Sequence, residues 1–221
     1  MGIGSAFGNA LRRESILSRY EQHRPQMKTG DVIGFSGNTG FSEVIKWGTG
    51  SMYSHVGIVL TASMGGGFGD SVLVVESTTE TSHQVASKEG QELIKGVQMN
   101  WLSKRALMYD GAVWWFPLKD PLPPEGRSKM EAWLRETHSQ RVTYDSIQVM
   151  GAGIKLWERL GLSGPEDLSR LFCSELVTKA LRVAGVVDPE INPSRQTPAN
   201  VVNFPCLDYP VLLKGDSTPV Q

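Results

Sequence analysis

Residues 55–77, "HVGIVLTASMGGGFGDSVLVVES", decide the fold. Two runs of β-branched and aliphatic residues, 55–61 and 71–76, flank a loop of glycine and other small residues. β-Branched residues favour extended backbone, and a glycine-rich loop lets the chain reverse. The stretch therefore predicts an antiparallel β-hairpin.

The outer ends of this predicted hairpin carry a histidine and a glutamate. If the turn is centred between Gly65 and Gly66, His55 and Glu76 lie opposite each other on one face, with Cβ atoms about 5 Å apart. The register is open by a residue or two, because a long loop tolerates a bulge. Glu76 would then orient the His55 imidazole as a base. The alternative is a strand-end histidine with a local hydrogen bond and an exposed glutamate.

A candidate nucleophile lies far along the chain, in "RLFCSELV", residues 170–177. Apolar residues recur at helical spacing through 173–185, which predicts a helix that begins at Cys173 and ends at Gly185. Free N–H groups at a helix N-terminus stabilise an anion, so this position favours a Cys173 thiolate. The alternative is a buried cysteine that only packs. Beside an oriented His55, Cys173 would have its general base.

The remaining pattern predicts an α+β fold, with strands early and helices late. We expect helices over 9–23, 42–48, 123–140 and 144–161, strands at 32–35, 93–102 and 111–118, and an extended tail over 191–213 that ends in an edge strand. The simplest organisation is a single domain over 1–221, with a leading helix in 1–26, a catalytic core in 27–214 and a tail in 215–221.

Composition narrows the function classes. The chain has 221 residues, 40% of them hydrophobic, which is typical of a globular protein. A net charge of -1 without a basic stripe argues against nucleic acid as a partner. Short apolar runs and a start without a signal-like segment predict no membrane span and a cytoplasmic location. Two cysteines in a reducing compartment predict free thiols, no metal site and no cofactor. The oligomeric state stays open.

Six short motifs appear in a fixed order: "GDVIGFSG" (30–37), "SHVGIVL" (54–60), "VVEST" (74–78), "YDS" (144–146), "FCSELV" (172–177) and "TPAN" (197–200). In this order they resemble the permuted papain-like amidases of the YiiX/YaeF type, relatives of the NlpC-type cell-wall peptidases and of lecithin retinol acyltransferase. The resemblance implies a circularly permuted papain-like fold, in which a helix carrying Cys173 packs on a small antiparallel sheet carrying His55.

The resemblance also implies roles for individual residues. Cys173 would attack a carbonyl, His55 would take and return the proton, and Glu76 would hold the imidazole. Tyr144 and the backbone N–H of Cys173 would stabilise the oxyanion.

Other residues compete for these roles or could line a substrate groove. Glu175 is a rival carboxylate, but two positions along the helix from Cys173 it points to another side. The rival bases His23, His83 and His138 fit solvated positions, and Cys206 fits a strand or loop. Trp47 and Tyr53 are candidate substrate-binding residues, although aromatic residues at such positions, including Trp114 and Trp115, are more often core.

The sequence leaves three functions open. The first is a cysteine-dependent amidase or peptidase that acts on a peptide, cell-wall or other acyl substrate through a thioester. The second is a lipid acyltransferase or phospholipase with the same triad. The third is a binding module that kept the fold without turnover.

Overall fold

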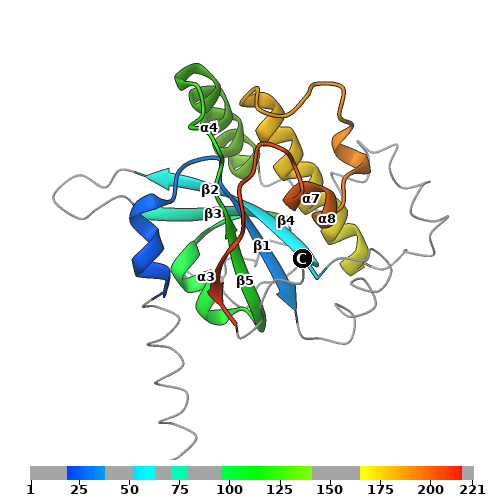
Figure 1. Ribbon diagram of the computed structural model, residues 1–221. Helices are drawn as coiled ribbons and strands as arrows, with labels where there is room; N and C mark the ends of the chain where they lie inside the picture. Colours follow the sequence, from blue (N-terminus) through cyan, green and yellow to red (C-terminus); the bar gives the residue numbers. More distant parts are fainter. Residues whose placement is uncertain (1–18, 38–51, 63–70, 79–95, 141–164, 216–221) are drawn as a thin grey trace, which may run out of the picture.

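The computed structural model describes residues 19–37, 52–62, 71–78, 96–140 and 165–215 (Figure 1). Its strands are β1 (Val32–Gly37), β2 (His55–Ala62), β3 (Ser71–Thr78), β4 (Gly96–Trp101), β5 (Gly111–Phe116) and β6 (Val211–Lys214). Its helices are α3 (Leu102–Met108), α4 (Pro124–Ser139), α7 (Pro165–Val183) and α8 (Pro198–Val202), with 3₁₀ turns η1 (Arg24–Gln26) and η2 (Pro193–Arg195).

The strands form one sheet in the order β4-β3-β2-β1-β5-β6, and every neighbouring pair is antiparallel. The predicted strands at 32–35, 93–102 and 111–118 and the hairpin are confirmed, as is the edge strand at the end of the chain. The sheet with its helices confirms the predicted α+β class.

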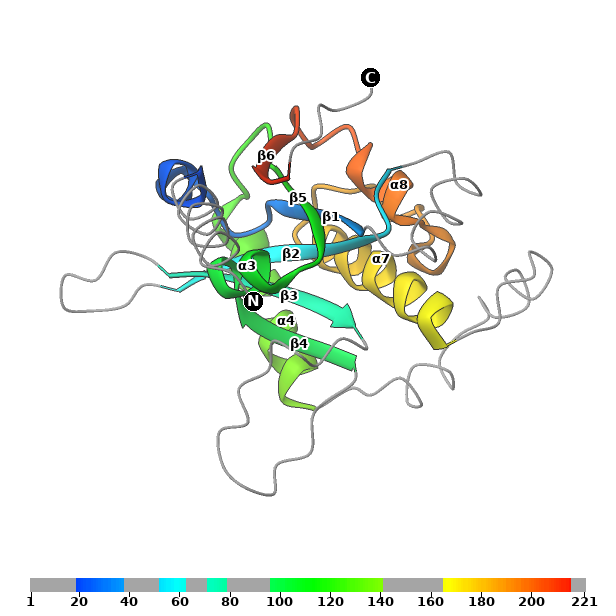
Figure 2. The ribbon, with the colours of Figure 1, turned by 90° about the horizontal axis from the view of Figure 1, so that it is seen from below.

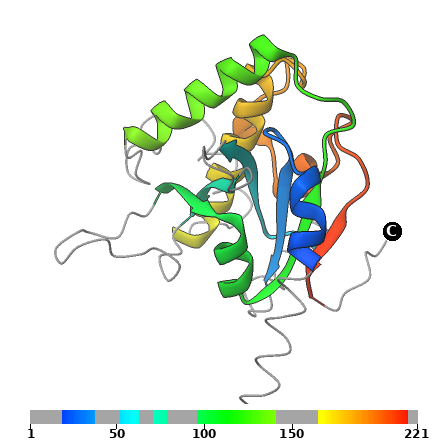
Figure 3. The ribbon, with the colours of Figure 1, turned by 90° about the vertical axis from the view of Figure 1, so that its left-hand side faces the viewer.

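Helices cover both faces of the sheet (Figure 3). On one face, Met130 and Leu134 of α4 and a row of α7 residues pack against Val56 and Ile58 of β2. On the other face, Leu102 and Ala106 of α3 pack against the remaining strand side chains. Side chains alternate along a strand, so β1, β2, β3 and β5 each contribute to both cores.

The hairpin register differs from the predicted one by two residues. Ile58 pairs with Val75, whereas a turn centred between Gly65 and Gly66 would pair Ile58 with Leu73. A shift of two keeps every side chain on its predicted face, because the strand period is two. His55 and Glu76 therefore share a face as diagonal neighbours, although they are not directly opposite.

Gly57 makes this diagonal contact possible. In the observed register Gly57 lies opposite Glu76. His55 and Val59 are the residues two positions before and after Gly57 on β2. A Cβ atom at Gly57 would stand 2.6 Å from Cγ2 of Val74 and 3.4 Å from Cβ of Glu76. A larger residue would press on the strand that carries the glutamate.

Helix α7 corrects the predicted helix start. It begins at Pro165, so Cys173 lies about two turns inside the helix and not at its N-terminus. Figure 2 shows α7 running alongside the sheet, where it contacts β2 and β3. Helix α4, predicted over 123–140, approaches α7 closely at Gly126, where a Cβ atom would lie 2.2 Å from the Ala184 carbonyl oxygen.

Two further expectations were wrong. Helix α3 was not predicted at all, because its seven residues directly follow β4 without a break in the pattern. The tail was expected to be extended, but it contains η2 and α8, and Thr197 and Asn200 form a capping box at the start of α8. "TPAN" thus encodes a helix start.

Some expectations lie partly or wholly outside the described residues. These are the helices over 42–48 and 144–161 and most of the helix over 9–23, of which residues 19–23 are helical. Within the described ranges, every helix is too short or too polar to cross a bilayer.

Candidate active site

His55 is the first residue of β2 and lies at one end of the sheet. Its side chain is buried, with 10% of its surface exposed. Nε2 of the ring is 2.7 Å from Oε2 of Glu76. This confirms that the two residues contact each other, through the diagonal arrangement. The contact occupies Nε2 and leaves Nδ1 for another partner.

Cys173 also lies beside the His55 side chain, and its charge and hydrogen bonding raise the pKa of the imidazole. Cys173 is fully buried and belongs to the core between α7 and the sheet. Glu76, in contrast, alternates with Val72 and Val74, which belong to the core on the α3 side. His55 therefore joins a thiol from one face of the sheet to a carboxylate from the other.

Glu76 is fully buried and bonded through both oxygens. Oε2 meets His55, and Oε1 accepts a hydrogen bond from Nε of Arg105 at 2.7 Å. Arg105 comes from α3 and is itself only 3% exposed. The sequence pattern gave no sign of this arginine, because its helix was not expected. The only signal for such an arginine in the sequence was the general rule that a buried, ionised carboxylate requires a partner of opposite charge.

The charges of these groups reinforce one another. Burial alone would lower the pKa of His55, but the charge and hydrogen bond of Cys173, together with those of Glu76, raise this pKa to about 9. Burial alone would raise the pKa of Glu76, but the Arg105 charge and the His55 contacts hold it well below its usual range. The imidazole is thus biased toward its charged form and Glu76 toward its anion.

The position of Cys173 changes the expected source of thiolate stabilisation. In the interior of α7, a backbone N–H normally donates to the carbonyl four residues earlier. The N-terminus of α7 is therefore not at hand to stabilise a Cys173 thiolate. The Cys173 N–H is likewise not available as an oxyanion donor. The stabilising charge comes from the imidazole of His55 instead.

The other candidate residues lie elsewhere. Tyr53 is buried and packs edge-on against Phe116 and Trp114, at centroid distances of 5.3 and 6.3 Å, and burial raises the pKa of Tyr53 to about 12. This is a core environment, which agrees with the alternative that aromatic residues at such positions pack in the core. Tyr144 and Trp47 lie outside the described residues.

The rival groups are also placed. Glu175 forms an ion pair with Lys179 one turn along α7, at 2.5 Å. His23 packs against Trp115, with ring centroids 5.9 Å apart, and His138 lies in the last turn of α4. Cys206 is half-buried in a turn, where burial raises the pKa of its thiol, and neither Cys173 nor Cys206 forms a disulfide. His83 lies outside the described residues.

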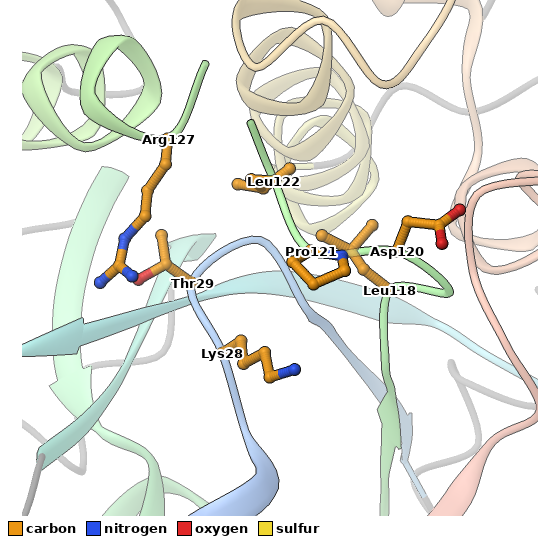
Figure 4. Close-up of a pocket in the computed structure, with 7 residues that line it drawn as sticks. All are labelled: Lys28, Thr29, Leu118, Asp120, Pro121, Leu122 and Arg127. Atoms are coloured by element: carbon orange, nitrogen blue, oxygen red, sulfur yellow. The ribbon is translucent and has the colours of Figure 1, made fainter. Parts of the chain in front are cut away.

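A small hollow lies at the other end of the sheet (Figure 4). It is lined by Lys28, Thr29, Leu118, Asp120, Pro121, Leu122 and Arg127. Thr29 hydrogen-bonds Thr61 near the end of β2, about 20 Å along the strand from His55. A volume of about 70 Å³ suits a few water molecules, well below a typical ligand pocket. This hollow includes none of the candidate site residues.

Comparison with solved structures finds a protein with the same fold. The chain has the fold of the metalloprotein YiiX from Escherichia coli O157:H7, with a TM-score of 0.52 and 18% sequence identity. The match covers 84% of this chain and 97% of YiiX. No protein-family model and no curated protein sequence matches the chain.

YiiX is described as a metalloprotein. In the part of the chain that the structure describes, no three His, Cys, Asp or Glu side chains form a group that could hold a metal ion. The two oxygens of Glu76 already accept from His55 and Arg105. These residues do not fit a metal centre.

Proposed function

We propose that the protein is a cysteine-dependent hydrolase that cleaves an amide, as an amidase or peptidase. The observation that carries the proposal is the buried series Cys173, His55 and Glu76, in which His55 hydrogen-bonds Glu76 and interacts electrostatically with Cys173. A cysteine beside an imidazole has the general base that activates it as a nucleophile.

The reaction follows from these contacts. The Cys173 sulfur forms a bond to the substrate carbonyl carbon, and the carbonyl π electrons move to oxygen. When the tetrahedral intermediate collapses, the carbon–nitrogen bond breaks and the leaving amine takes a proton from Nδ1 of His55. A thioester remains on Cys173. Water then attacks the thioester, gives its proton to His55, and releases the acid and the thiolate.

Glu76 supports both halves of this cycle. It accepts from Nε2, which fixes the ring and directs Nδ1 toward the sulfur. Its negative charge also stabilises the imidazolium that waits to protonate the leaving group. The likeness to the YiiX fold and the order of the sequence motifs agree with a permuted papain-like enzyme. Tyr144 is proposed as an oxyanion donor on the sequence resemblance alone.

The thiol is fully buried, so the residues that cover it must move before a substrate carbonyl reaches the sulfur. This requirement favours a substrate with a narrow acyl portion over a globular protein surface.

Trapping the thioester tests the proposal. Native protein and a Cys173→Ala variant would be incubated with peptides, cell-wall fragments, isopeptides and lipid esters, and then quenched in acid for intact-mass analysis. We expect an acyl adduct and product with the native protein and neither with Cys173→Ala, whereas Cys206→Ala should behave as native. Turnover confined to lipid esters would favour the acyltransferase or phospholipase alternative. No turnover across all classes would favour the binding module.

A further inference from the structure

Arg105 is connected to the candidate site through Glu76. Its Nε donates to Oε1 of Glu76 at 2.7 Å, while Oε2 of the same carboxylate meets His55, also at 2.7 Å. The carboxylate therefore bridges the arginine and the imidazole. With both oxygens engaged and no surface exposed, Glu76 cannot rotate without losing one of these contacts.

Two aromatic rings hold the guanidinium in place. Cζ of Arg105 lies 4.9 Å from the ring centroid of Phe35 and 5.0 Å from that of Tyr109. Phe35 also packs against the His55 ring, with a centroid distance of 5.3 Å. The two rings also pack edge-on against each other, with centroids 4.9 Å apart, and beside them the arginine gains cation–π attraction and loses freedom of movement. Lysine cannot reproduce the planar contact.

The short helix that carries Arg105 is anchored at its C-terminal end. Nζ of Lys214, on β6, donates to the carbonyl oxygens of Ala106 and Leu107 at 3.0 and 3.1 Å and to that of Tyr109. These are end carbonyls that α3 cannot satisfy by itself. A seven-residue helix is marginal alone, so this anchor fixes where Arg105 stands.

We propose that Arg105 is a positioning residue for the hydrolase, acting through Glu76 on the charge state of His55 and Cys173. This rests on the proposed function. Arg105 keeps Glu76 ionised and turned toward the ring, so that the imidazolium retains its counterion and remains the partner of the thiolate. Among the described residues, Arg105 from α3, His55 from β2 and the neutral Gln98 opposite it on β4 face Glu76, and Cys173 interacts with His55.

The direction of the effect follows from the charges. Without Arg105, the carboxylate binds a proton at higher pH or turns away from the ring. His55 then loses the anion that keeps it charged, and the thiolate forms only at higher pH. We expect the acid limb of Cys173 alkylation to move up by about one pH unit, which is about tenfold slower reaction below the limb.

The test is the pH profile of iodoacetamide labelling of Cys173, from pH 4 to 10, followed by peptide mass spectrometry. Arg105→Met removes the charge, and Arg105→Lys keeps it. Arg127→Met is the matched control, because Arg127 also donates from Nε to a glutamate, Glu131, at 2.7 Å but with half its side chain exposed. We expect a shift for Arg105→Met, a smaller shift for Arg105→Lys and none for Arg127→Met. A purely structural arginine would lower the melting temperature of Arg105→Met and leave the profile of the folded protein unchanged, which would overturn the proposal.

A double-mutant comparison covers the case in which Arg105→Met fails to fold. Glu76→Gln removes the buried anion, so Glu76→Gln with Arg105→Met carries no unpaired buried charge. If Arg105 acts through Glu76, adding Arg105→Met to Glu76→Gln leaves the labelling profile unchanged. A further upward shift of the limb in this background would contradict the proposal.

The same experiment separates the two proposals. If His55→Ala leaves native labelling of Cys173 unchanged, the hydrolase proposal itself fails. If His55→Ala slows labelling but folded Arg105→Met does not, only the role of Arg105 fails.

Discussion

Replacing Glu76 by glutamine removes one charge from the buried series while keeping the shape of the side chain. In the native protein, both carboxylate oxygens accept hydrogen bonds, from His55 and from Arg105, each at 2.7 Å. Glutamine has one carbonyl oxygen and one amide NH₂. One of the two partners must therefore face a donor, and the Arg105 charge stays buried without a counterion.

The structure sets the size of both effects. Removing one partner of a buried ion pair costs about 3–5 kcal/mol of folding free energy. Two charges about 4 Å apart interact by about 4 kcal/mol at an effective dielectric constant of about 20, or roughly three pKa units. The amide dipole retains part of this interaction. We therefore expect the pKa of His55 to fall and Cys173 alkylation at pH 6 to slow by about 10- to 100-fold.

The assay combines urea unfolding with iodoacetamide labelling of Cys173 at pH 6. Glu131→Gln is the control, because this glutamate makes the same contact to an arginine at 2.7 Å on the partly exposed side of α4. Such a pair contributes at most about 1 kcal/mol. Labelling of Glu76→Gln at the native rate, or an equal loss in Glu131→Gln, would refute the reasoning.

Three further predictions follow from individual contacts. Labelling of Cys173 relative to free thiol should decline above about pH 9, where His55 loses its proton, and a profile that is flat through this range would contradict the raised pKa. Gly57→Ala should destabilise the fold by about 1–3 kcal/mol in urea unfolding, because its Cβ would lie 2.6 Å from Cγ2 of Val74. A variant as stable as the native protein would show that β3 can shift to make room at little cost. Asp31→Ala should cost about 3 kcal/mol or more in urea, since it leaves the N–H groups of Lys28, Leu118 and the Trp115 indole without their acceptor. Cys173 of the Asp31→Ala variant should be labelled at the native rate. Slower labelling would mean that the candidate site depends on the stability of the whole sheet.

The pH dependence of stability has a definite sign. The pKa of His55 is raised by folding, so its contribution is fully present below about pH 6.5 and is lost as pH rises toward 9. The pKa of Glu76 is lowered, so its contribution is present above about pH 4.5 and is lost as the solution becomes more acidic. The site therefore stabilises the fold most between these limits.

The hairpin shows how much of the site could be predicted from sequence. Alternation and glycine content placed β2 and β3 and put His55 and Glu76 on one face. Turn geometry within a glycine-rich loop is not specified by pattern, so the register came out two residues away. The predicted shared face was still correct, because a shift of two residues preserves the alternation of side chains along a strand.

Cys173 and Arg105 show where pattern reasoning stops. The apolar spacing identified the helix around Cys173 but its start was placed at Cys173, although Leu168 and Phe172 extend the same spacing toward the N-terminus. Arg105 lies on a seven-residue helix, too short for a periodic signal. Its role depends on a carboxylate 29 residues away in sequence, and only the folded sheet brings the two together.

The central claim is that His55 sets the reactivity of Cys173, and one measurement tests it most directly. Native protein and His55→Ala would be labelled with iodoacetamide at pH 6, with Cys206 in the same molecule as the internal reference. The account predicts that native Cys173 reacts at least tenfold faster than Cys206, and that His55→Ala abolishes this advantage without unfolding the protein. Native Cys173 that reacts no faster than Cys206, or an advantage that persists in His55→Ala, would contradict it.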